Sequence, residues 1–98
     1  MDTTLSLKQL IKHFFLSVEK EIENLMQDDH RRTRIRVVQG ILNLNLIHGK
    51  DEAVLVLDAS EHMSLYILSI KDGQQPVRRT LSLTVTPREV AGHLIGSL

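Results

Sequence analysis

The sequence predicts a two-layer α+β domain, in which a long N-terminal helix and a short C-terminal helix flank a four-stranded antiparallel meander sheet. Apolar residues follow helical spacing over the first 28 residues, and the period then changes to two after residue 34. A second helix signal follows near Thr86. The length of 98 residues fits a single domain, 1–98, with the element order α-β-β-β-β-α.

Both predicted helices begin with a capping signal. Ser6-Leu7-Lys8-Gln9 has the form of a capping box, so we expect the first helix to begin at Ser6 and to end near Asp28. In the second helix Thr86 is the expected cap, Pro87 occupies the first helical position, and Glu89 completes the box.

The four predicted strands are separated by short turns, which favour antiparallel pairing because parallel strands need long crossovers. We expect the first strand to run unbroken through Gly40, with the glycine marking a bulge or a bend. In the last strand, leucines and valines alternate with threonines and serines up to Val85, which predicts one polar face. The predicted strands are 34–47, 53–57, 65–70 and 78–85.

The first three predicted strands are apolar on both faces, which is unusual for an antiparallel sheet. Two helices cover both faces only if they lie on opposite sides, and the second helix is short. The sequence therefore predicts either such an arrangement or an uncovered apolar face that binds a partner or a second copy. The residues expected at this interface are Val54, Val56, Tyr66 and Leu68, although the sequence leaves open which face is used.

Four arginines lie in the stretch 30–36, and they are the second candidate binding site. In a strand Arg34 and Arg36 point to the same face, and arginine forks suit phosphate or carboxylate groups. The alternative is a solvated connection balanced by nearby acidic residues. The partner-binding arginines are Arg31, Arg32, Arg34 and Arg36, and the acidic residues expected to balance them are Asp28, Asp29, Asp58 and Glu61.

Signals for catalysis or for a bound metal are weak. The chain has no cysteine, and no two of its five histidines have the spacing that places two ligands on one helix face. Ser60, His62 and Asp58 lie close in sequence, but no nucleophile-elbow motif accompanies them. We expect no enzymatic activity, no catalytic residue, no metal and no cofactor.

These observations favour a non-enzymatic protein-binding or regulatory module that acts as a homodimer or docks on a protein partner. The first alternative is a nucleic-acid-binding protein that uses the basic stretch 30–36, which is less favoured because the net charge is zero and no aromatic residue is interleaved. The second is a carrier of a small apolar ligand, with a pocket between the first helix and the sheet. The sequence shows no signal peptide and no apolar run that spans a bilayer, so we expect a cytoplasmic protein that does not enter a membrane.

Overall fold

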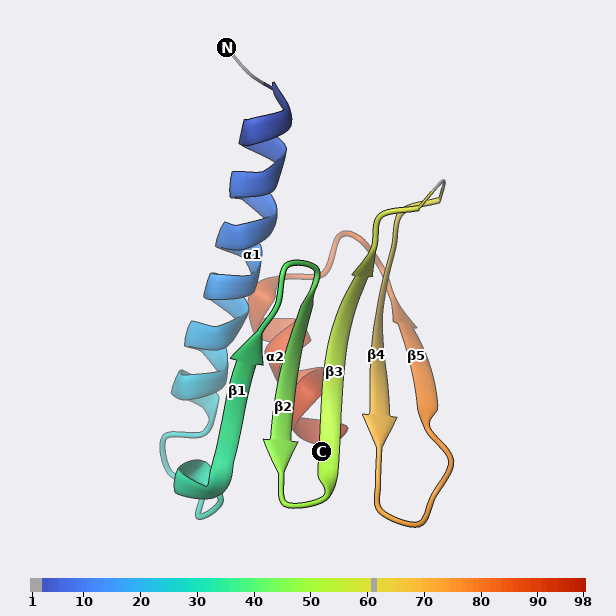
Figure 1. The fold of residues 1–98 in the computed structure, drawn as a ribbon. Coiled ribbons are helices and arrows are strands. Elements are labelled where there is room, and N and C mark those ends of the chain that lie inside the picture. Colours follow the sequence, from blue (N-terminus) through green and yellow to red (C-terminus); the bar gives the residue numbers. More distant parts are fainter. Residues whose placement is uncertain (1–2, 61) are drawn as a thin grey trace.

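The computed structural model describes residues 3–60 and 62–98, and it has the predicted two-layer α+β architecture with a long first helix and a short last one (Figure 1). The elements are α1 (Thr3–Leu25), η1 (Arg32–Arg34), β1 (Ile35–Gln39), β2 (Asn43–His48), β3 (Asp51–Asp58), β4 (Ser64–Ile70), β5 (Val77–Leu81) and α2 (Pro87–Gly96). The strands form one sheet in the order β1-β2-β3-β4-β5, with every neighbouring pair antiparallel. The predicted meander is confirmed.

The sheet has five strands because the predicted first strand is a hairpin. The chain turns back after Gly40, whose N–H donates to the carbonyl of Asn43 over 2.8 Å. The prediction of one strand over 34–47 was therefore wrong, and the error changes which side chains share a face. A single strand would place Val37 and Leu46 on opposite faces, whereas the hairpin pairs them side by side.

The last strand ends at Leu81, four residues earlier than predicted. Beyond it the chain turns, with the N–H of Val85 donating to the carbonyl of Ser82 over 3.2 Å. The hydroxyl of Ser82 contacts that of Thr84 at 2.7 Å. Hydroxyl side chains that hydrogen-bond locally compete with strand pairing, so the regular alternation of this segment was misleading.

One of the two predicted caps is confirmed. In α2 the N–H of Glu89 donates to Thr86 Oγ1 and the N–H of Thr86 donates to Glu89 Oε1, both over 3.2 Å. The first helix, in contrast, begins at Thr3, so Ser6 lies inside it and the prediction of a start at Ser6 was wrong. It ends at Leu25, somewhat before the predicted end.

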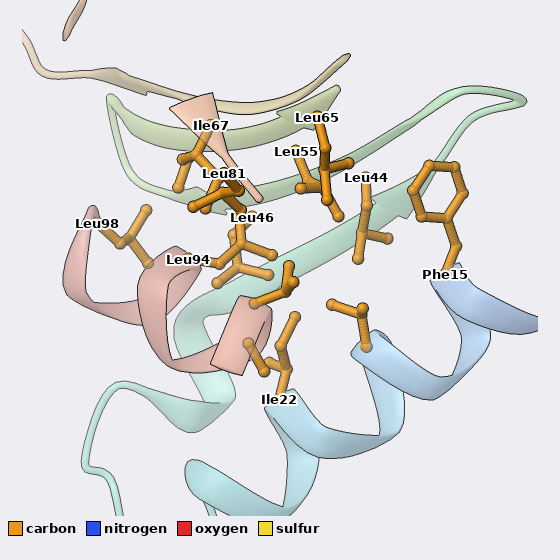
Figure 2. Close-up of a cluster of buried hydrophobic side chains, with 14 of the residues drawn as sticks. Phe15, Ile22, Leu44, Leu46, Leu55, Leu65, Ile67, Leu81, Leu94 and Leu98 are labelled. Atoms are coloured by element: carbon orange, nitrogen blue, oxygen red, sulfur yellow. The ribbon is translucent and has the colours of Figure 1, made fainter. Parts of the chain in front are cut away.

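Both helices pack on the same face of the sheet, as Figure 1 and Figure 2 show. From α1 the core takes Phe15, Val18 and Ile22, and from α2 it takes Val90, Ala91 and Leu94. These side chains meet alternate strand residues, among them Leu44, Leu46, Ala53, Leu55, Leu65 and Ile67. The arrangement with the helices on opposite faces is therefore excluded, and the other face of the sheet faces away from both helices.

Candidate functional site

The face of the sheet that points away from the helices is called the outer face. Its members follow from the register, because neighbours along a strand alternate between the core and the opposite side. Val54 pairs with Leu68, and Val56 pairs with Tyr66, so the four apolar residues predicted for an interface lie together at its centre. The outer face comprises Arg36, Val38, Asn43, Asn45, Ile47, Glu52, Val54, Val56, Asp58, Ser64, Tyr66, Leu68, Ile70, Arg78 and Thr80.

The centre of the outer face consists of apolar side chains from paired positions of β3 and β4. Val54 is only 9% exposed, although it belongs to no part of the helix-covered core. Its neighbours on the adjoining strands, Asn45 and Leu68, shield it. Val56, Tyr66 and Leu68 are half-buried. An apolar centre of this kind, surrounded by polar residues, is typical of a protein-binding surface.

Polar and charged groups lie on two sides of this centre. On one side the amide of Asn43 donates to Asn45 Oδ1 over 2.6 Å, and the amide of Asn45 in turn donates to Glu52. On the other side the guanidinium of Arg78 lies 3.8 Å from the centroid of the Tyr66 ring. Neither feature was predicted from the sequence, because both depend on which residues are neighbours across adjoining strands.

The four arginines of the stretch 30–36 do not form one surface. Arg31 is held by Asp29, with Nη2 donating to Oδ2 over 3.0 Å and Nε donating to Oδ1 over 3.2 Å. Arg32 Nη1 donates to the carbonyl of Gln27 over 3.3 Å. Arg34 belongs to η1 rather than to a strand, so the predicted alternation does not link it to Arg36. Only Arg36 lies on the outer face.

The contact between Asp29 and Arg31 also sets the local electrostatics. The side-chain hydrogen bonds from Arg31, with a further one from its backbone N–H, lower the pKa of Asp29 to about 2. The same pair raises the pKa of Arg31. Part of the positive charge of this segment is therefore neutralised within the chain.

The acidic residue Asp58, expected to balance the arginines, has a different role. It ends β3 and accepts a hydrogen bond from the N–H of Ser60 over 3.0 Å, which lowers the pKa of its carboxyl group. It therefore forms a turn, while Glu61 lies outside the described residues. Among residues 3–60 and 62–98, no group of three or more histidine, aspartate and glutamate side chains is placed to hold a metal ion.

Within the described chain, neither helix has the length and apolarity that crossing a bilayer requires. No protein-family model matches the sequence, and the searches of curated proteins and of solved structures give no significant match.

Proposed function

We propose that the protein is a non-enzymatic protein-binding module that forms a homodimer through the outer face of its sheet. The observation that supports this is the packing of both helices on one face, which leaves Val54, Val56, Tyr66 and Leu68 on the other (Figure 1). Burying such an apolar centre against a second surface is favourable, because it removes apolar area from water.

A second copy of the chain suits this surface because of its charges. In a two-fold symmetric dimer the same patch meets itself, so a rim of one sign would repel its copy. The rim of the outer face carries both signs, with Arg36 and Arg78 at its two edge strands and Glu52 between them. The whole chain has a net charge of zero, so no long-range repulsion opposes association.

The test is the mass of the protein in solution. Val56→Glu places a charge in the apolar centre, and Leu83→Glu places the same charge on a residue that is 57% exposed outside the sheet. We expect a dimer at micromolar concentration for the wild type and for Leu83→Glu, and a folded monomer for Val56→Glu. Sedimentation equilibrium gives the mass, and circular dichroism verifies the fold of each variant.

A monomeric wild type at these concentrations would contradict the homodimer. A Val56→Glu variant that still dimerises would show that the dimer uses another surface. Should Val56→Glu fail to fold, Asn45→Arg offers a milder change, because it adds a charge on the rim and leaves the apolar residues intact. We expect this variant to dimerise more weakly than the wild type, and an unchanged dissociation constant would count against the outer face.

A second candidate function is nucleic-acid binding by the arginines of the stretch 30–36. The observation in its favour is that, in the described part of the chain, Arg31 has a carboxylate within ion-pair distance whereas Arg32, Arg34 and Arg36 have none. This function is less favoured, because Arg31 is neutralised and no aromatic side chain lies within the stretch for base stacking.

Salt dependence distinguishes this candidate from the first. Binding through phosphates weakens steeply with salt, because each neutralised phosphate releases counterions. We expect the wild type to bind no oligonucleotide even at low salt. Tight and salt-sensitive binding, lost in the double variant Arg34→Glu/Arg36→Glu but kept in Arg88→Glu on α2, would establish the nucleic-acid function instead.

A further inference from the structure

A cleft of about 630 Å³ opens between the N-terminal half of α1 and the tip of the β1–β2 hairpin. Its walls come from Lys8, Ile11 and Lys12 on the helix and from residues 39–42 of the hairpin. The volume lies within the range of roughly 300–1,000 Å³ that is usual for sites that bind small molecules. Further along α1 core side chains occupy much of the space between the helix and the sheet, so this cleft lies at the end of that layer.

The hairpin side of the cleft is apolar and held in place. Ile41, at the tip, is 90% exposed, the highest exposure of any large apolar residue in the described chain. Turn positions are usually taken by glycine, asparagine, aspartate or serine. The turn geometry therefore does not account for an isoleucine at this position. The carbonyl of Leu42 accepts a hydrogen bond from the N–H of Leu57 over 2.9 Å, which ties this turn to β3.

The helix side of the cleft carries positive charge. Lys8 and Lys12 are four residues apart, so they lie on one face of α1, one turn from each other. Both side chains are exposed, and among the described residues that line the cleft none is acidic. The apolar side chains among the described lining residues are aliphatic, and none of these residues has an aromatic ring to stack on a flat ligand.

We propose that this cleft binds an aliphatic carboxylate, whose chain lies against Ile11, Ile41 and Leu42 and whose carboxylate lies between the ammonium groups of Lys8 and Lys12. The apolar wall suits a flexible hydrocarbon chain. The two lysines suit a negatively charged group, because none of the described residues that line the cleft is acidic. The site uses no residue of the outer face, so it does not depend on the proposed homodimer.

Calorimetric titration of the full chain with dodecanoate, below the concentration at which it forms micelles, tests the proposal. We expect saturable binding with one dodecanoate per chain. The double variant Lys8→Glu/Lys12→Glu should lose about tenfold or more in affinity, because charge-assisted contacts are replaced by repulsion. Ile41→Asn should also weaken binding. The matched control is Lys20→Glu, an exposed lysine of the same helix outside the cleft, which should bind like the wild type.

Two further ligands identify the chemistry that is recognised. Dodecanol has the same chain without the charge, and we expect it to bind about tenfold more weakly than dodecanoate. Vesicles of phosphatidylglycerol present anionic headgroups on a surface, and we expect them not to bind. The proposal would be overturned if dodecanoate showed no saturable binding, or if Lys8→Glu/Lys12→Glu bound it as tightly as the wild type does. It would also be overturned if the wild type bound dodecanol as tightly as dodecanoate, or bound only the vesicles. None of these outcomes bears on the mass of the protein, which tests the dimer separately.

Discussion

The guanidinium of Arg78 lies over the ring of Tyr66, 3.8 Å from the ring centroid, at the border between the apolar centre of the outer face and its edge strand. In the register Arg78 pairs with Leu68, and Tyr66 pairs with Thr80, so the arginine reaches diagonally from β5 to β4. The contact places a positive charge beside the apolar centre, and the guanidinium covers one face of the aromatic ring.

Replacing this arginine should weaken the sheet. We expect Arg78→Gln to lower the free energy of unfolding by about 0.5–1 kcal/mol, the usual worth of an exposed cation–π contact. The control is Arg79→Gln, because Arg79 is also exposed but pairs with Ile67 on the opposite face of the sheet. Urea denaturation measures both variants, and equal losses would show that the contact with Tyr66 contributes nothing.

Acid should weaken the connection between α1 and β1. The pKa of Asp29 is lowered from its ordinary value of 3.8 to about 2, so protonating this carboxyl group favours the unfolded state. The stability from its contact with Arg31 is therefore fully present above about pH 4 and is lost as the pH falls to about 2. Denaturation midpoints between these values should fall less steeply for Asp29→Asn than for the wild type.

Asp28→Asn is the control for this acid effect, since Asp28 is the adjacent and more exposed carboxylate. Its midpoints should follow those of the wild type. The same dependence on pH in the wild type and Asp29→Asn would mean that the Asp29–Arg31 contact does not survive in solution.

The two capping signals should respond differently to the same substitution. Thr86→Ala removes the acceptor at the start of α2 and should cost about 0.5–2 kcal/mol of stability. Ser6→Ala replaces a residue within α1, where alanine is the better helix former, so it should not lower stability. Chemical denaturation compares the two, and a loss for Ser6→Ala as large as that for Thr86→Ala would place the start of α1 at Ser6.

A methyl group at Gly40 should disturb the outer face through Asn43. A Cβ atom at this position would overlap the side-chain oxygen of Asn43, so the asparagine would have to move and give up its hydrogen bond to Asn45. We expect Gly40→Ala to cost about 0.5–1.5 kcal/mol. In an Asn43→Ala background the obstacle is gone, and the same substitution should cost nothing. A double-mutant cycle measures this coupling, and strictly additive effects would contradict it.

The strongest sequence signals were those in which several local preferences agreed. Thr86, Pro87 and Glu89 form a cap whose three parts support one another, and the structure confirms it. Ser6 and Gln9 form the same pattern, yet the chain before them is also helical, because a capping pattern does not prevent the helix from starting earlier. The meander followed correctly from the short connections.

The first hairpin was missed because its turn looks like a strand. Gly40 was interpreted as a bulge or a bend, and Ile41 and Leu42 have the branched or apolar side chains that favour strands. The sequence nevertheless placed Val54, Val56, Tyr66 and Leu68 on one surface, since β4 and the central part of β3 were predicted correctly. It offered a pocket between the first helix and the sheet only as an alternative and did not locate the cleft, whose position depends on the missed turn.

The order of the strands also bears on how the chain folds. Each strand pairs with its neighbour in sequence, so the sheet forms by closing a series of short loops, each at a small entropic cost. The packing of α1 against α2 is different, because it joins segments separated by the whole sheet. We therefore expect the hairpins to form early and the two helices to meet after the transition state for folding, so that core substitutions in α2 speed unfolding more than they slow folding.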